Sequence, residues 1–292
     1  MIKVFVSDMD NTLYPWVDFI VPALEAMVSN LEETTGFPRI EIIQSLKAVY
    51  DKYGSNEYPF AIQESAIFQR FSYDFMSFNK VIIEPARKAF SQTRRKYQSF
   101  YPGVEKTLAE LRGKVGKMAL LTDAPRNAAE GRVKQFELER FFDALYCMPG
   151  YPLPEGRVDP EIAERDKRGE YKAKGIKVIE LERHWQKPSV EGLKKIIADY
   201  GVKPEEVLVV GDNLQKDIAL AQRVGCIDVW AEYGTYIPLE YRERLEVISS
   251  GEELKRNMVS DELLEAIKPN YRISNFELLL DFINLQESDA ER

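Results

Sequence analysis

The chain has 292 residues, of which 45% are hydrophobic and 30% are charged, so it can form a substantial core and is not extensively disordered. Its formal charge of -8 disfavours nucleic acid or an anionic membrane as a general partner, because both attract positive surfaces. No apolar run approaches the roughly 20 residues that span a bilayer, and Met1 leads straight into a strand without a signal-peptide core. We therefore expect a cytoplasmic protein in which Cys147 and Cys226 are buried, reduced thiols.

The first predicted element places two carboxylates directly after a buried strand. Residues 2–6 are apolar and rich in β-branched side chains, which predicts a strand, and Asp8 and Asp10 follow at its carboxyl end. Ligands of open α/β sheets bind at that edge. An extended chain would point the two acids to opposite sides, so a common target requires a turn, which Asn11 and Thr12 suit. Taken alone, such an Asp-x-Asp is more often an acidic turn that caps the next helix.

Residues 17–98 change character and predict a helical insert. Apolar side chains recur there at helical spacing in four blocks, which Gly and Pro residues at 36–38, 54–56 and 84–85 separate. The aromatic residues at 60–78 are expected to form mainly the core of this insert, although a minority could line a pocket.

An alternating pattern of strands and helices then resumes. Strands are predicted at 117–121, 144–148, 207–210 and 227–231, and helices at 104–111, 127–136, 189–200 and 217–224. This alternation predicts parallel βαβ units, and hence an α/β fold with a doubly wound parallel sheet.

Two segments depart from this regular pattern. Residues 149–186 contain a charged run at 161–170 and a strand-like stretch at 176–181, which we interpret as a β-hairpin flap beside the active site. A solvated excursion is the alternative. After Tyr233, we expect a charged helix over 238–268 and an apolar helix over 271–285, packed on the core or forming a subunit contact.

Polar residues collect at three predicted strand ends. They are Asp8 with Asp10 after the first, Thr122 after the second, and Asp212 with Asp217 after the third, while Lys187 precedes the helix that leads to the third. Carboxylates from separate strands can converge on a hard cation, and Mg2+ prefers such oxygen ligands. An aspartate that attacks phosphorus forms an aspartyl-phosphate, and a second acid protonates the leaving oxygen and then activates water. The hydroxyl of Thr122 and the ammonium of Lys187 would hold the phosphoryl oxygens.

The segment Asp8-Met9-Asp10-Asn11-Thr12-Leu13 resembles the first motif of the haloacid dehalogenase-like (HAD) hydrolases. The remaining three motifs follow in order as Leu120-Leu121-Thr122, Lys187-Pro188, and Gly211-Asp212-Asn213 with Asp217. The resemblance implies that Asp8 is the nucleophile and Asp10 the general acid and base. It also implies that Asp8, the backbone carbonyl of Asp10, and Asp212 hold Mg2+, with Asp217 near the metal directly or through water.

The resemblance further implies the domain organisation. The HAD core would comprise residues 1–16 and 99–292, including the insert 149–186 and a C-terminal extension at 233–292. Family members of this layout carry a helical cap between the first two motifs, which corresponds here to residues 17–98.

Asp10 favours a phosphatase over a dehalogenase, because dehalogenation within this family needs no acid two residues after the nucleophile. We therefore expect an Mg2+-dependent phosphomonoester hydrolase that acts on a small phosphorylated metabolite. Two alternatives stay open: a phosphotransferase or phosphomutase of the same family, whose cap keeps water from the aspartyl-phosphate, and a non-catalytic binding or regulatory module. The sequence does not distinguish a monomer from a homodimer.

Four further polar residues lie near the motifs. Asn213 either caps the following helix or orients the acids, and Asp123 and Arg126 either contact substrate or shape a turn. His184 is expected to be structural or exposed, because Asp10 already supplies the proton-transfer group.

Overall fold

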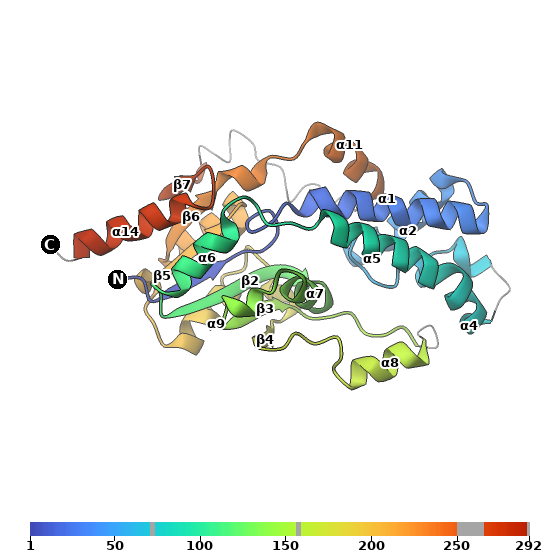
Figure 1. Cartoon of the computed structure of the whole chain (residues 1–292), viewed down its shortest axis with the longest axis horizontal. Helices are drawn as coiled ribbons and strands as arrows, with labels where there is room; N and C mark the ends of the chain where they lie inside the picture. The colour runs from blue at the N-terminus through green and yellow to red at the C-terminus, as the bar shows by residue number, and fades with distance from the viewer. Residues whose placement is uncertain (71–73, 156–158, 250–265, 291–292) are drawn as a thin grey trace.

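The computed structural model of the chain describes residues 1–70, 74–155, 159–249 and 266–290 (Figure 1). Among these residues, seven strands form one parallel sheet in the order β4-β3-β2-β1-β5-β6-β7. The strands are β1 Val4–Ser7, β2 Lys117–Pro125, β3 Ala144–Met148, β4 Lys177–Glu180, β5 Val207–Gly211, β6 Ile227–Ala231 and β7 Tyr271–Ile273. The predicted α/β fold with a doubly wound parallel sheet is confirmed.

Helices cover both faces of this sheet. Successive side chains of a strand point to opposite faces, so each strand contributes to the core on both sides. Phe5 of β1 packs in a cluster with α6 Val104–Arg112, α7 Arg126–Phe136 and α14 Leu278–Ala290. Its neighbours Val4 and Val6 pack on the other face, in a cluster with α9 Glu191–Tyr200 and α10 Ala219–Val224. Burial on both faces explains why these strands read as continuous apolar runs.

A group of helices between β1 and β2 forms the predicted helical insert. Its helices are α1 Trp16–Thr35, α2 Arg39–Tyr53, α3 Ala61–Glu64, α4 Phe75–Phe78 and α5 Glu84–Tyr97. The long helices α1 and α5 pack side by side, to one end of the sheet in Figure 1. Gly36 and Gly54 end α1 and α2 with φ of 69° and 65°, a left-handed conformation that glycine adopts without steric cost. The division into a cap at 17–98 and a core remains a prediction.

The segment 149–186 does not form the predicted hairpin flap. Its strand β4 pairs in parallel with β3, in the register Ala144 to Lys177, and so extends the sheet at one edge. The hairpin interpretation was wrong because a strand-like stretch does not identify its partner, which here lies about thirty residues earlier in the chain. The same segment contains α8 Pro160–Lys167, and Asp159 at its start accepts a hydrogen bond from Asn79 of the helical insert, 3.0 Å away.

The C-terminal extension first returns to the helical insert and then rejoins the sheet. Helix α11 Leu239–Ile248 packs against α1 and α2, where Arg244 pairs with Glu25 and the Lys47 ammonium donates to the Glu246 carbonyl at 2.9 Å. The predicted helix over 238–268 is thus confirmed for its first part, and residues 250–265 lie outside the described residues. The prediction of one helix over 271–285 was wrong at its start, because residues 271–273 form the edge strand β7 before α14 begins.

Two smaller expectations can be compared with the described residues. Cys147 and Cys226 are buried and free, as predicted. No helix in the described ranges is both long and apolar enough to cross a membrane.

Candidate active site

The turn after β1 ties the first strand to the end of β5. Asn11 has a φ of 57°, and its side-chain oxygen accepts a hydrogen bond of 3.1 Å from the amide of Trp16 at the start of α1. The buried hydroxyl of Thr12 accepts a hydrogen bond of 3.1 Å from the amide of Asp212, two hundred residues later in the chain. Thr12 therefore does more than shape a loop, because it holds the loops after two neighbouring strands in register.

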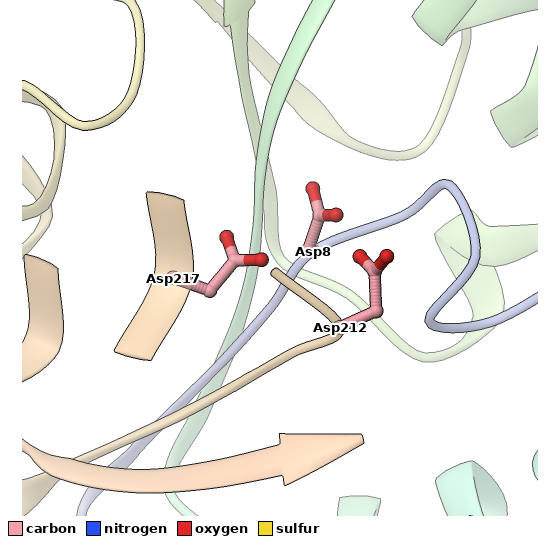
Figure 2. Close-up of side chains that lie close together, drawn as sticks. All are labelled: Asp8, Asp212 and Asp217. Atoms are coloured by element: carbon pink, nitrogen blue, oxygen red, sulfur yellow. The ribbon is translucent and has the colours of Figure 1, made fainter. Parts of the chain in front are cut away.

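Three carboxylates and one ammonium meet at the carboxyl edge of the sheet. Carboxylate oxygens of Asp8, Asp212 and Asp217 lie within 4.8 Å of one another, and Figure 2 shows their side chains close together, Asp8 from the turn after β1 and the other two from the loop and helical turn after β5. The Lys187 ammonium donates hydrogen bonds of 2.7 Å to Asp8 and to Asp217. All of them except Asp212 are buried, and Asp212 is partly exposed. Four of the predicted site residues are therefore brought together.

Burial and like charge govern the electrostatics of this cluster. Burial, together with the Asp217 carboxylate, raises the pKa of Asp8 to about 7 against the opposing effect of Lys187. Burial and the charges of Asp8 and Asp217 hold the pKa of Asp212 well above its usual range. Although burial alone would lower it, the carboxylates of Asp217 and Asp8 keep the pKa of Lys187 above its ordinary value. Three acids thus share one buried cation, and the raised pKa values of Asp8 and Asp212 reflect their burial and mutual repulsion.

The loops around the cluster hold these groups in place. Thr122 is buried beside the cluster, and its hydroxyl accepts a hydrogen bond of 3.1 Å from the Ala124 amide. Asp123 accepts a hydrogen bond of 2.8 Å from the backbone amide of Lys187 and pairs with Lys216 at 3.2 Å. Asp123 also lines the cavity over the site, so contact with substrate and a role in the turn both stay predictions for it.

Asn213 and Arg126 also make structural contacts. Asn213 accepts hydrogen bonds from the amides of Gln215 and Lys216 at 3.1 and 3.0 Å, so it caps the helical turn that carries Asp217. Arg126 pairs with Glu130 at 3.0 Å and with Glu180 at 2.6 Å. His184 is exposed and lies near Glu182, in agreement with the expectation for it.

Asp10 lies in a different environment from Asp8, although only one residue separates them. Its carboxylate oxygen is 3.2 Å from Nε of Arg132, a buried residue of α7. Burial raises the pKa of Asp10, the Arg132 guanidinium opposes that rise, and Glu57 adds to it. The carboxylate of Asp10 is not among the three that cluster around Lys187, and the metal contact of its backbone carbonyl stays a prediction.

Several residues that support the site carried no recognisable signal in the sequence. The indole of Trp230 donates to the Asp212 carbonyl at 2.7 Å, and the Tyr233 hydroxyl donates to the Thr12 carbonyl at 2.6 Å. A Cβ atom at Gly234 would lie 1.9 Å from the carbonyl oxygen of Asn11, so only glycine allows the turn after β6 and the first turn to approach so closely. The sequence shows a glycine at position 234, but it does not show the long-range contact with Asn11 that requires it.

A cavity of about 420 Å³ opens over the cluster and is shared between core and insert. Core residues of the four motifs form its floor, and the last residues of α2 from Asp51, with the loop that follows as far as Glu57, form one wall. Tyr151 and Arg183 also line it. They lie near the two ends of the segment that joins β3 to Lys187. Tyr151 lies edge-on against the ring of Tyr58, with centroids 4.9 Å apart.

Acids and one lysine at the carboxyl edge of a parallel sheet, under a helical insert after the first strand, define the class of HAD-type hydrolases. A family model described as haloacid dehalogenase-like hydrolase matches residues 2–165, and one described as HAD-hydrolase-like matches residues 184–266. The chain belongs to the haloacid dehalogenase-like hydrolase family, and its relatives, described next, make it a member of the phosphatase type.

Individual relatives of the chain are phosphatases, and a solved structure shares its fold. The chain is 26% identical over 250 residues to a glyceraldehyde 3-phosphate phosphatase of Pyrococcus furiosus, covering 83% of this chain and 86% of the relative. It is 26% identical over 245 residues to the enzyme of that name from Methanopyrus kandleri, covering 83% and 89%. The crystal structure of a 2-haloacid dehalogenase from Pseudomonas syringae pv. Tomato DC3000 shares the fold, with a TM-score of 0.59, 17% identity, and coverage of 98% and 100%.

Replacing Gly211 with alanine is expected to impair the site more than the fold. A Cβ atom there would lie 2.3 Å from the carboxyl carbon of Asp217, so the carboxylate that binds Lys187 must move. We expect Gly211→Ala to lower phosphatase kcat by about tenfold or more, since misplaced groups of a preorganised site cost rate steeply. Gly131→Ala is the matched control, because a Cβ atom there meets nothing within 4 Å in α7. Equal activity of the two variants would contradict the prediction.

The buried acids also predict how stability depends on pH without metal. A folded-state pKa of about 7 for Asp8, against an ordinary value of 3.8, means that the folded protein binds more protons than the unfolded chain between these values. In EDTA, the contribution of Asp8 to the free energy of unfolding should therefore decrease as pH rises from 5 to 8. Urea unfolding should show wild type losing stability relative to Asp8→Asn over that range. Parallel pH profiles of the two proteins would refute this.

Proposed function

We propose that the protein is an Mg2+-dependent phosphomonoesterase that acts on a small phosphorylated metabolite through an aspartyl-phosphate on Asp8. One observation carries the proposal. Asp8 lies in a buried cluster with Lys187, Asp212 and Asp217, while Asp10 is held apart from that cluster by Arg132. Two carboxylates in different environments can serve as nucleophile and as proton carrier in one reaction.

The donor set fits Mg2+. Three carboxylates converge around a single ammonium, and hard oxygen ligands of this kind suit a small divalent cation. Asp8 and Asp212 would hold the ion together with the backbone carbonyl of Asp10, and Asp217 would contact it directly or through water. When bound, Mg2+ would neutralise the negative charge of the phosphoryl group and of the acids around it.

The residues of the chain then divide the two chemical steps between them. In the first step, the Asp8 carboxylate attacks phosphorus, and Asp10 donates a proton to the leaving alkoxide as the P–O bond breaks. In the second step, Asp10 takes a proton from a water molecule that attacks the aspartyl-phosphate, and phosphate leaves. The hydroxyl of Thr122 and the ammonium of Lys187 stabilise the charge on the phosphoryl oxygens in both steps.

Substrate size and class follow from the cavity and from the relatives. A volume of about 420 Å³ with charged and hydroxyl groups in its walls suits a small polar molecule. The relatives in Pyrococcus furiosus and Methanopyrus kandleri are glyceraldehyde 3-phosphate phosphatases, and a relative in Thermotoga maritima is a phosphorylated carbohydrates phosphatase. We infer that short phosphorylated sugars and sugar-like acids are the substrate class.

Hydrolysis of 4-nitrophenyl phosphate tests the reaction without knowledge of the natural substrate. We expect turnover with Mg2+, loss of turnover in EDTA, and recovery when excess Mg2+ is added back. Asp8→Asn should remove activity by about a thousandfold or more, because it removes the nucleophile. Arg140→Gln is a control on the surface of the core, where Arg140 pairs with the exposed Glu105.

A panel of phosphorylated metabolites that includes glyceraldehyde 3-phosphate and phosphoserine should then identify the substrate class by kcat/KM. Phosphate release with no transfer to an added sugar phosphate would distinguish a hydrolase from a phosphotransferase. Activity that survives in EDTA and in Asp8→Asn would overturn the proposed function.

A further inference from the structure

Arg132 occupies an unusual place between the core and the helical insert. It lies on α7 of the core, its side chain is 2% exposed, and it contacts two carboxylates that line the cavity. Nε is 3.2 Å from Asp10, and Nη2 donates a hydrogen bond of 2.7 Å to Glu57. The guanidinium also faces the ring of Phe19 in α1, 5.8 Å from its centroid. One side chain of the core therefore joins Asp10 to the loop after α2.

Stability alone does not account for this arrangement. Removing a guanidinium and carboxylates from water is costly, and a buried ion pair often stabilises a fold no better than apolar side chains of similar size. The planar guanidinium can address two acids in fixed directions at once, which an ammonium cannot do. Its two partners here are the predicted proton carrier and a residue of the opposite cavity wall.

We propose that Arg132 is a positioning residue that fixes the Asp10 carboxylate for proton transfer to the leaving group, and that Glu57 holds Arg132 in the orientation this requires. The proposal rests on the proposed function, in which Asp10 carries the proton. Arginine stays charged at every working pH, so Arg132 orients Asp10 without exchanging a proton with it. Proton transfer depends on hydrogen-bond distance to the leaving oxygen, so a small rotation of the carboxylate is sufficient to slow it.

The contact also links catalysis to the position of the helical insert. Glu57 follows α2, and its side chain reaches across the cavity wall to α7 of the core. If this loop moves away, Arg132 loses the partner that directs its Nη2, and Asp10 loses a fixed neighbour. Proton transfer is then efficient only while the loop after α2 keeps Glu57 against Arg132.

A pair of substrates of similar shape separates this role from a structural one. 4-Nitrophenyl phosphate has a good leaving group that needs little protonation, whereas phenyl phosphate has a poor one that depends on the general acid. We expect Arg132→Gln to lower kcat/KM for phenyl phosphate about tenfold or more beyond its effect on 4-nitrophenyl phosphate. Asp10→Asn should show the same selective loss in larger measure, and Asp8→Asn should lose both substrates.

Matched variants control for the change of charge and for folding. Arg126→Gln removes another arginine of α7 that pairs with two carboxylates, Glu130 and Glu180, and it should leave the ratio of the two kcat/KM values unchanged. Arg132→Lys keeps the charge near Asp10 and should restore part of the ratio. Thermal melting of each variant, read by circular dichroism, shows which of them are folded.

The contact between Arg132 and the insert is tested by substituting its partner Glu57. Glu57→Gln should shift the ratio in the same direction as Arg132→Gln but by less, and the double variant should be no worse than Arg132→Gln alone. Glu64→Gln is the control, since Glu64 accepts hydrogen bonds from Tyr53 and Lys52, which both belong to the insert. Both Glu57 and Glu64 lie in the insert, so a general loosening of it would affect both.

The outcomes separate the two proposals. If Arg132→Gln lowers kcat/KM equally for both substrates, or if the Glu57 and Arg132 effects simply add, the positioning role is wrong while the phosphatase stands. If Arg132→Gln does not fold, the ratios for Arg132→Lys and Glu57→Gln decide, and unchanged ratios in both overturn the proposal. If wild type fails to hydrolyse either substrate with Mg2+, the proposed function itself has failed.

Discussion

The ammonium of Lys187, buried between Asp8 and Asp217, is the contact on which the rest of the site depends. A buried charge is tolerated only when partners satisfy it, so the three loops that supply this lysine and these two acids must meet at one point. Asp123 binds the backbone of Lys187, and the absence of a side chain at Gly211 leaves room for Asp217. Asp212 completes a set in which negative charge exceeds positive charge, and this imbalance favours a divalent cation.

A second constraint is that the helical insert is fastened to the core at points far from its own chain connections. Arg244 of α11 pairs with Glu25 of α1, and Tyr151 packs against the stacked rings of Tyr53 and Tyr58. The insert, the segment before Lys187 and the C-terminal extension thus support one another around a single cavity. Because these contacts fix the cavity walls, they set the shape that a bound molecule must fit.

The sequence was sufficient to predict those features that depend on a pattern of neighbouring residues. The strands from 144–148 and 227–231 were predicted with their observed bounds, and the four motifs placed Asp8, Thr122, Lys187 and Asp212 at the correct edge of the sheet. Edge strands β4 and β7 were misinterpreted because they are four and three residues long, and their partners are distant in sequence. Arg132 and Glu57 carried no local signal at all, since a charged residue in a helix or loop is usually solvated.

Asp8 and Asp10 show how one turn can give the same functional group two roles. Both are aspartates with pKa values raised by burial, so their intrinsic chemistry is alike. Their partners differ, because Asp8 faces an ammonium from the third motif and Asp10 faces a guanidinium from α7. In the proposed reaction, the Lys187 ammonium would also hold phosphoryl oxygens as charge develops, whereas the Arg132 guanidinium, held by Glu57, would keep the Asp10 carboxylate in place. The two acids of the first turn therefore differ in the cation that each meets, and this difference supports the separate roles of nucleophile and proton carrier that we propose for them.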